Sequence, residues 1–201
     1  MLYPFWKTWW KLNGWSFSGE SPYNIKKAVV IVGPHTSWKD LVVGLAARNV
    51  LQLEHIKFMG KKELFHGPLG WFLSSVGGTP VDRKNSNGIV KQAVSLFNNN
   101  DEFILALSPE GTRKRVNRLR TGFYYIAKNA NVPIVMVGLD FANKQVIISV
   151  PFHTSDDKEE DFNQIHSFFM SVRGRFPEHG LQHFKAKSGI IYSFKNSLSH
   201  L

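Results

Sequence analysis

Short apolar runs alternate with amphipathic segments along most of this chain of 201 residues. The apolar runs are rich in β-branched and aromatic residues, which predicts strands, and the spacing of apolar positions between them predicts helices. The predicted strands are residues 26–32, 55–59, 77–81, 103–107, 133–139 and 145–150. The predicted helices are residues 37–51, 85–99, 119–128 and 156–172, with a helix interrupted by turn residues between 61 and 73. This alternation predicts an α/β fold, a mostly parallel mixed sheet flanked by helices.

Residues 1–18 have a different composition, and we interpret them as an amphipathic aromatic helix that precedes a single domain over residues 19–201. Four of the six tryptophans of the chain lie here, with aromatic residues at helical spacing and Lys7 and Lys11 on the other side. Tryptophan and lysine together are typical of a helix that lies in the membrane–water interface. The alternative, which stays open at this point, is a terminal helix that packs on the core of the protein.

The composition narrows the possible chemistry. The chain has no cysteine, which excludes disulfides, thiolate metal ligands and a thiol nucleophile. The net charge of +10 comes from residues 1–155, which hold nineteen Lys and Arg against nine Asp and Glu. Such a charge favours anionic partners such as a phospholipid surface or a phosphorylated substrate. We see neither a membrane-spanning segment nor a secretory signal, and we expect a cytoplasmic protein attached peripherally to the cytoplasmic face of a membrane.

The octet from Gly33 to Asp40 is the best candidate for a functional site. His35 follows a predicted buried strand and Asp40 begins the next helix, at the strand end where α/β folds place their chemistry. A carboxylate that accepts a hydrogen bond from one imidazole nitrogen leaves the other nitrogen free to take a proton from a hydroxyl. A purely structural alternative is that Ser37 and Asp40 form a capping box.

Two further turns follow predicted strands, Asp82-Arg83 and the segment 110–113 with sequence Glu-Gly-Thr-Arg. If the strands are parallel neighbours, all three turns converge on one sheet edge and form a site that binds an anion and moves a proton. Residues 113–120 add a cluster of Arg and Lys whose forked guanidinium groups match phosphate oxygens. A G-x-S-x-G nucleophile motif is missing, so we expect the reacting hydroxyl to belong to a substrate.

The order of these motifs resembles that of the glycerolipid acyltransferase superfamily, whose members include the 1-acylglycerol-3-phosphate (lysophosphatidic acid) acyltransferases. His35-x-x-x-x-Asp40 looks like the H-x4-D signature of that family. The segment 78–83 (GTPVDR) resembles its second block, 109–113 (PEGTR) its third, and 132–135 (VPIV) its fourth. The segment around Lys62 looks like the lysine-containing stretch between the first two blocks.

The resemblance implies transfer of a fatty acyl group from an acyl-CoA or acyl-carrier-protein thioester to a hydroxyl of a lysophospholipid such as 1-acylglycerol-3-phosphate. It implies His35 as the general base and Asp40 as its orienting partner. The residues implied in substrate binding are Lys62, Arg83, Glu110, Gly111, Thr112, Arg113 and Arg120. No metal and no cofactor beyond the thioester co-substrate are implied, and the implied partners are the donor, the lysophospholipid acceptor and a membrane surface.

Several alternatives stay open from the sequence. The same chemistry could act on another lipid acceptor, such as a lyso-aminolipid, because the residues around Thr79 and Lys114 depart from the usual pattern of the family. A non-enzymatic nucleic-acid-binding protein would explain the basic cluster, but it leaves His35 and Asp40 without a role, so we expect no nucleic acid. A metal site at His179-x-x-x-His183 has suitable helical spacing but only a two-residue match.

Overall fold

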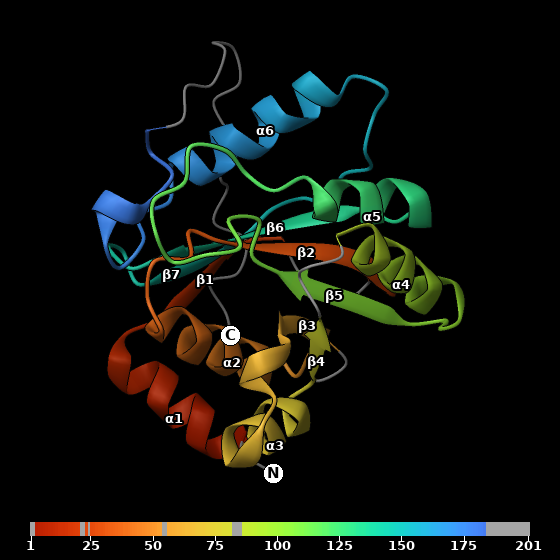
Figure 1. Ribbon diagram of the computed structural model, residues 1–201. Coiled ribbons are helices and arrows are strands. Elements are labelled where there is room, and N and C mark those ends of the chain that lie inside the picture. Colours follow the sequence, from red (N-terminus) through yellow and green to blue (C-terminus); the bar gives the residue numbers. More distant parts are fainter. Residues whose placement is uncertain (1–2, 21–22, 24, 54–55, 82–85, 184–201) are drawn as a thin grey trace.

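The computed structural model describes residues 3–20, 23, 25–53, 56–81 and 86–183. Its centre is a seven-stranded sheet with the strand order β1-β7-β6-β2-β5-β3-β4 (Figure 1). The strands are β1 (Ser16–Gly19), β2 (Lys27–Gly33), β3 (Ile56–Lys61), β4 (Gly78–Val81), β5 (Phe103–Leu107), β6 (Ile134–Asp140) and β7 (Gln145–Ile148). The predicted class, a mostly parallel mixed sheet flanked by helices, is confirmed.

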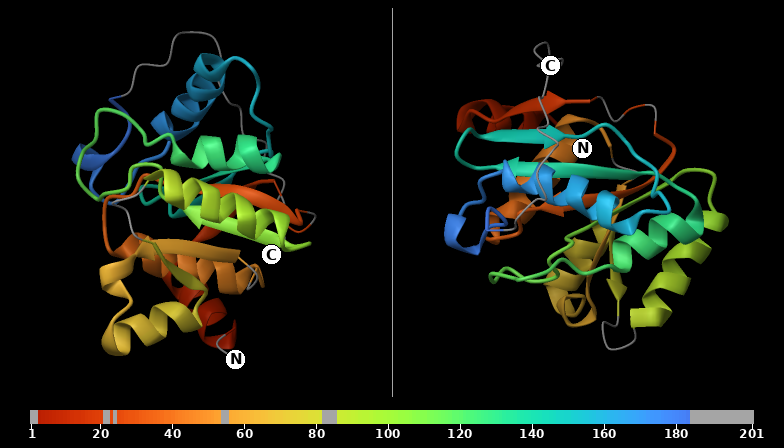
Figure 2. Two further views of the ribbon diagram at one scale, coloured as in Figure 1. Left: turned by 45° about the vertical axis from the view of Figure 1, so that its right-hand side comes forward. Right: turned by 90° about the horizontal axis from the view of Figure 1, so that it is seen from above.

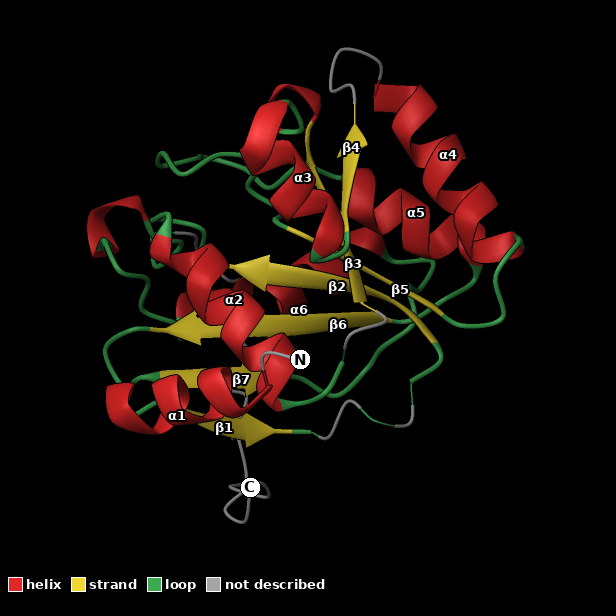
Figure 3. Ribbon diagram, turned by 90° about the horizontal axis from the view of Figure 1, so that it is seen from below, coloured by secondary structure: helices red, strands yellow, loops and turns green. Residues whose placement is uncertain are grey.

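Helices cover both faces of this sheet. The helices are α1 (Tyr3–Asn13), α2 (Lys39–Val50), α3 (Gly67–Ser75), α4 (Ser86–Asn98), α5 (Gly122–Ala130) and α6 (Lys158–Met170), with short 3-10 turns η1 (Lys62–Leu64) and η2 (Pro177–His179). The view from above in Figure 2 shows α4, α5 and α6 on one face, and Figure 3 shows α1, α2 and α3 on the other. None of the helices in the described part of the chain is long and apolar enough to cross a bilayer.

The central strand β2 shows why these residues form a buried strand. Val29 and Ile31 pack into the core under α4, α5 and α6, whereas Ala28 and Val30 pack into the core under α1 and α2. Side chains alternate between the faces of a strand, so a strand buried on both faces must be apolar at every position. The uninterrupted run of β-branched residues in β2 meets this requirement, and it fixes the place where the next loop begins.

The strand directions bring several loops to one edge of the sheet. β2 runs parallel to both β5 and β6, and β3 runs parallel to both β5 and β4. β7 is antiparallel to β6, and β1 is parallel to β7. The carboxyl ends of β2, β3, β4, β5 and β6 therefore share one edge, which is where the loop after β2 and the loop after β5 lie.

The N-terminal segment differs from the prediction of one helix over residues 1–18. Helix α1 ends at Asn13, and Ser16–Gly19 form the edge strand β1, which pairs with β7. Trp10 and Trp15 are buried, and the Trp10 ring stacks on Phe17 with 4.5 Å between ring centroids. The aromatic spacing hid the strand because Trp15 and Phe17 continue the apolar pattern of the helix. Trp6 and Trp9 are partly buried and pack against the same core, so all four tryptophans that suggested a membrane helix contact the core of the protein.

Other boundaries shift by a few residues. α2 begins at Lys39 instead of Ser37, and α5 begins at Gly122 instead of Leu119. Helix α6 begins as its acidic first turn predicts, because the Asp157 side chain accepts hydrogen bonds from the backbone N–H groups of Glu159 and Glu160. The interruption predicted between residues 61 and 73 corresponds to the break between η1 and α3.

Candidate active site

The loop between β2 and α2 carries the candidate histidine at the carboxyl edge of the sheet. The peptide bond between Gly33 and Pro34 is cis. Thr36 and Ser37 are buried, whereas 27% of the His35 side chain is exposed. A short loop between an apolar strand and a helix thus holds one imidazole partly exposed. The two residues that follow the histidine in this loop are buried.

His35 and Asp40 face each other, as their spacing predicts. The distance between His35 Nδ1 and Asp40 Oδ2 is 3.1 Å, and the Asp40 side chain is 2% exposed. The same Oδ2 atom accepts hydrogen bonds from the backbone N–H groups of Thr36 and Ser37, each at 2.7 Å. The hydrogen bond from the Ser37 N–H is one half of the predicted capping box, and the same carboxylate faces the imidazole, as the catalytic interpretation requires. The imidazole keeps 27% of its side chain exposed while Nδ1 faces Asp40.

Glu110 joins this pair from a distant part of the chain. Its Oε1 atom accepts a hydrogen bond from the backbone N–H of His35 at 2.6 Å, and the residue is buried. Burial raises the pKa of Glu110 to about 7; the hydrogen bond from His35 lowers it, and the nearby Asp40 carboxylate raises it further. Sequence reasoning expected Glu110 in substrate binding, and the contact shows that it also holds the histidine loop in place.

Three buried polar atoms lie beside the histidine loop with no hydrogen-bond partner in the part of the chain that the structure describes. They are Asp40 Oδ1, Ser108 Oγ and Glu110 Oε2. Buried oxygens without partners are rare in protein interiors and concentrate at functional sites. Two of the three belong to the carboxylates that contact His35. These carboxylates can therefore accept further hydrogen bonds there.

The loop between β5 and α5 contains the predicted basic block. Gly111 has a positive φ of 66°, and a Cβ atom built on it would lie 2.5 Å from Arg120 Nε, so the Arg120 side chain crosses directly over this glycine. The backbone N–H of Arg120 donates to the carbonyl of Pro109 at 2.8 Å, which closes the loop on itself. Thr112 Oγ1 accepts from the backbone N–H of Lys114, and Arg113 is exposed. Cationic side chains thus begin three residues beyond Glu110.

The remaining predicted residues are less closely tied to the histidine. Lys62 is exposed in η1, directly after β3, and so lies at the same sheet edge. Its side chain makes no contact with His35, Asp40 or Glu110 among the interactions of the described residues. Arg83 lies outside the described residues, as does Asp82. The structure therefore brings His35, Asp40 and Glu110 into contact, and places the third block beside them.

The metal alternative at the C-terminal histidines finds no support in the described residues. They contain no group of three or more His, Cys, Asp or Glu side chains that could hold a metal ion. The His183 nitrogens lie 3.0 Å from the carbonyl oxygen of Gly180 and 2.8 Å from that of Val116. These contacts give His183 a structural role, in which it fixes the basic loop to the C-terminal segment.

Sequence reasoning missed one segment that supports the histidine loop. The backbone N–H of Phe176 donates to Thr36 Oγ1 at 3.2 Å, and a Cβ atom on Gly174 would lie 2.8 Å from Thr36 Cγ2. No local pattern signals this contact, because the two partners lie 140 positions apart.

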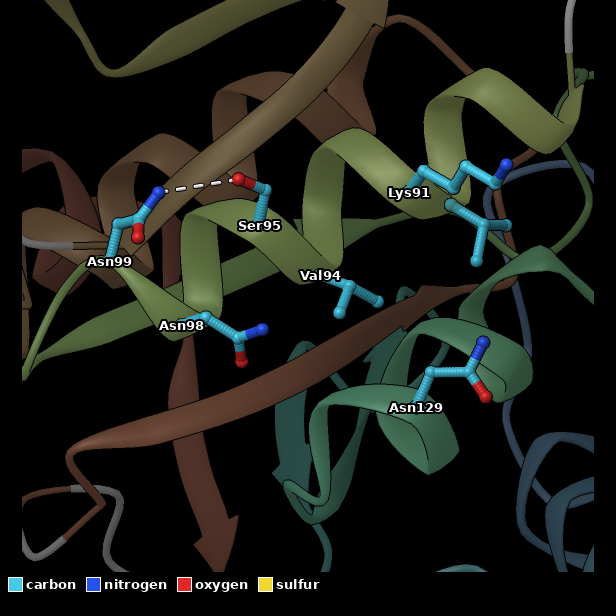
Figure 4. Close-up of a pocket in the computed structure, with 7 residues that line it drawn as sticks. Lys91, Val94, Ser95, Asn98, Asn99 and Asn129 are labelled. Carbon is cyan, nitrogen blue, oxygen red and sulfur yellow. Dashed lines mark hydrogen bonds between the residues drawn. The ribbon is translucent and has the colours of Figure 1, made fainter.

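A shallow cavity between α4 and α5 has no connection to this site. It has a volume of about 330 Å³ and is lined mainly by the side chains drawn in Figure 4, including Ser95, Asn98 and Asn129. Asn98 ends α4 and Asn129 lies in the last turn of α5, which is the opposite end of the sheet from His35. We assign it no function.

Comparisons with known proteins identify the family of this chain. A sequence model of the Acyltransferase family matches residues 16–140, and the chain belongs to this family. The chain is 32% identical to a 1-acyl-sn-glycerol-3-phosphate acyltransferase of Streptococcus pneumoniae over 132 residues, which are 61% of this chain and 48% of that protein. The chain thus spans about half the length of this curated relative.

A solved structure shares the fold. The crystal structure of the 1-acyl-sn-glycerophosphate (LPA) acyltransferase PlsC from Thermotoga maritima superimposes with a TM-score of 0.57 at 18% sequence identity. The match covers 94% of this chain and 80% of that one. The structural likeness therefore extends beyond the residues that the family model matches, into the C-terminal segment that supports the histidine loop.

Proposed function

We propose that this protein transfers a fatty acyl group from a thioester to a hydroxyl of a lysophospholipid such as 1-acylglycerol-3-phosphate. The observation that carries the proposal is the contact between His35 Nδ1 and Asp40 Oδ2 in a histidine whose side chain is 27% exposed. Family membership and the similarity to a 1-acyl-sn-glycerol-3-phosphate acyltransferase support the same chemistry. The proposed acceptor is a membrane lipid, so we place the protein on the cytoplasmic face of a membrane.

The proposed reaction needs one base and no covalent enzyme intermediate. His35 Nε2 takes the proton of the acceptor hydroxyl. At the same time the hydroxyl oxygen of the acceptor attacks the thioester carbonyl carbon, and a C–O bond forms. The carbon–sulfur bond of the tetrahedral intermediate then breaks, and the leaving thiolate takes the proton back from the imidazolium. The products are an ester and a free thiol, and the imidazole returns to its neutral form. Asp40 keeps Nδ1 protonated and stabilises the imidazolium between the two steps.

The loop after β5 is the proposed site for the acceptor phosphate. Arg113 and Arg120 lie on the same loop as Glu110, and Glu110 contacts the backbone of His35. A phosphate bound here would hold the acceptor hydroxyl on the histidine side of the loop, and guanidinium groups bind phosphate oxygens in pairs. We extend the proposal to Lys62 and Arg83, which the family resemblance implies in binding and which follow strands of the same sheet edge.

The direct test is acyl transfer by a His35→Ala variant. Purified protein is incubated with acyl-CoA and lysophosphatidic acid, and release of free thiol is followed. Loss of a general base typically lowers the rate by about 10²–10⁴. His153→Ala is the control, because His153 is an exposed histidine that lies outside the site. A His35→Ala protein that keeps its thermal unfolding transition and its full rate would overturn the proposal.

The acceptor assignment has a separate test. Arg113→Ala should raise the KM for lysophosphatidic acid more than the KM for the acyl donor, because it removes one charged contact to the phosphate. A panel of lysolipids with and without a phosphomonoester head group then decides between this acceptor and a lyso-aminolipid. If Arg113→Ala changes the KM for all acceptors equally, its assignment to the phosphate is wrong.

A further inference from the structure

A second groove, of about 490 Å³, opens on the other side of the histidine loop from the basic block. It is formed by the end of α1, the beginning of α2, the β6–β7 turn and the segment after α6. Its walls are aromatic and aliphatic, and its rim is basic. The lining residues are Trp9, Asn13, Trp15, Trp38, Lys39, Val42, Val43, Phe141, Lys144 and Arg175.

This groove is close to the candidate catalytic histidine. Trp38 follows His35 by three residues, so their Cα atoms lie within roughly 11 Å of each other. Arg175 lies between Gly174 and Phe176, both of which contact Thr36 in the histidine loop. One wall of the groove is therefore continuous with the loop that carries His35.

The charge of the groove is uniformly positive. Lys39, Lys144 and Arg175 are exposed, and no acidic residue is among the lining residues. Within the described part of the chain, none of the three has a carboxylate within ion-pair distance. The carboxylate of Asp140, next to the groove, is buried and accepts hydrogen bonds from Ala142 and Asn143 inside the β6–β7 turn. The three cations are therefore available to an anionic ligand.

The walls favour a ligand that carries a flat ring as well as negative charge. Trp38 is 61% exposed at the mouth of the groove, and the Trp15 ring packs edge-on against Phe141 deeper in. Indole faces stack on planar bases, and cations beside them bind phosphates. A volume of this size is within the range that holds a ligand of nucleotide size.

We propose that this groove binds the phosphorylated adenosine end of an acyl-CoA donor. The inference rests on the proposed function, which requires a thioester next to His35 and leaves its carrier open. The adenine would stack on the aromatic wall, and the phosphates would lie between Lys39, Lys144 and Arg175. The flexible pantetheine arm would then cross the histidine loop, so that donor and acceptor approach His35 from opposite sides.

An equilibrium measurement tests the groove without relying on turnover. Adenosine 3′,5′-bisphosphate and CoA are titrated into the full chain by calorimetry, and the titrations are repeated with the Lys144→Ala/Arg175→Ala double variant. Loss of two charge-assisted contacts should raise both Kd values at least about tenfold. Lys91→Ala is the control, because Lys91 is an exposed lysine on α4 at the other pocket. It should leave both Kd values unchanged.

A kinetic measurement then connects the groove to the reaction. The double variant should show a higher KM for acyl-CoA, while the KM for the lysolipid acceptor stays that of the unaltered protein. Its preference for acyl-CoA over an acyl-pantetheine, which lacks the nucleotide, should fall at least about tenfold. Failure of acyl transfer in the unaltered protein would contradict the proposed function. The titrations would still show whether the groove binds CoA.

Three results would overturn the inference. They are no binding of CoA or the bisphosphate by the unaltered protein, equal Kd values for the double variant and the unaltered protein, and turnover with acyl-carrier protein but not with acyl-CoA. A KM effect on the lysolipid alone would instead assign the groove to the acceptor, which also contradicts the proposal.

Discussion

Asp40 is the residue in which folding and proposed catalysis are most closely joined. One oxygen, Oδ2, accepts from two backbone N–H groups and faces the imidazole of His35. Asp40→Ala leaves those two buried donors without an acceptor, so we expect a loss of about 2 kcal/mol or more in the free energy of unfolding. Asp40→Asn keeps an acceptor oxygen and should be less destabilising. Both variants should lower kcat, because the ring loses its carboxylate.

Denaturant unfolding and the thiol-release assay separate these two effects. Asp156→Ala is a suitable control, because its fully exposed carboxylate pairs only with Lys128 at 3.5 Å. Such surface pairs contribute little to the free energy of unfolding. This control should therefore keep both the stability and the acyl-transfer rate of the unaltered protein. An Asp40→Asn protein with an unchanged rate would show that the carboxylate only caps the helix.

Glu110 makes the stability of the protein depend on pH. Its pKa is 4.5 for the unperturbed carboxyl and about 7 in the folded state. Between pH 4.5 and about 7 the folded state retains this proton while the unfolded state releases it. The contribution of Glu110 to the free energy of unfolding is therefore fully present below pH 4.5 and is lost as the pH rises toward 7. The loss amounts to on the order of 3 kcal/mol.

Glu110→Gln removes this titration and keeps an oxygen that can accept from His35. The difference in unfolding free energy between this variant and the unaltered protein should therefore change between about pH 4.5 and about pH 7, in favour of the variant at higher pH. Glu102→Gln is the control, because Glu102 is exposed. The unfolding free energy of this variant should depend on pH in the same way as that of the unaltered protein. A constant difference for Glu110→Gln over this interval would show that Glu110 is ionised throughout.

At the scale of elements, α1 is part of the core as well as part of the surface. Trp10 is 6% exposed and packs with Trp15, whereas Phe5 on the same helix is 59% exposed. Trp10→Ala should cost about 3–5 kcal/mol, as truncation of a buried aromatic residue does. Phe5→Ala should change stability by less than about 0.5 kcal/mol. Equal stability of the two variants would mean that α1 is not anchored to the domain through Trp10.

The elements differ in how much of them the sequence predicts. β2, β5 and β6 are predictable, because a central parallel strand must be apolar on both faces. β1 is not, because Ser16–Gly19 has little pattern of its own and is a strand only through its pairing with β7. In the site, the five-residue separation between His35 and Asp40 is a signal that the local sequence carries. The contact of Glu110 with His35 and that of Phe176 with Thr36 depend on tertiary packing, which no local pattern encodes.

At the scale of the whole molecule, three distant segments meet around one histidine. The β2–α2 loop supplies the imidazole, the β5–α5 loop supplies Glu110 and basic residues, and residues 173–176 support the loop from the other side. The parallel strand order puts the first two at one edge. His35 thus lies between the basic loop after β5 and the groove proposed for the donor, and both positive surfaces would attract the anionic substrates of the proposed reaction.

The face of the molecule formed by α1 and α3 has the surface expected for contact with lipid. Leu12 is 82% exposed and Trp71 is 78% exposed, and Leu69 and Phe72 beside Trp71 are exposed as well. Figure 1 shows both helices on the side of the sheet that α2 covers, furthest from α6. Exposed apolar side chains of this kind mark an interaction surface, and under the proposed function we expect that surface to face a bilayer.

Vesicle binding tests this orientation better than removal of the helix, because deletion of α1 would also remove Trp10 from the core. Leu12→Ala/Trp71→Ala should weaken binding to anionic vesicles at least about tenfold, since each side chain would bury apolar area in the bilayer. Val150→Ala is the control, because Val150 is also exposed but follows β7 and belongs to neither helix. Co-sedimentation at low and high salt separates this apolar contribution from the attraction due to the net charge of +10. If the double variant and the control bind equally well at high salt, lipid contacts a different face, and α1 and α3 serve the fold alone.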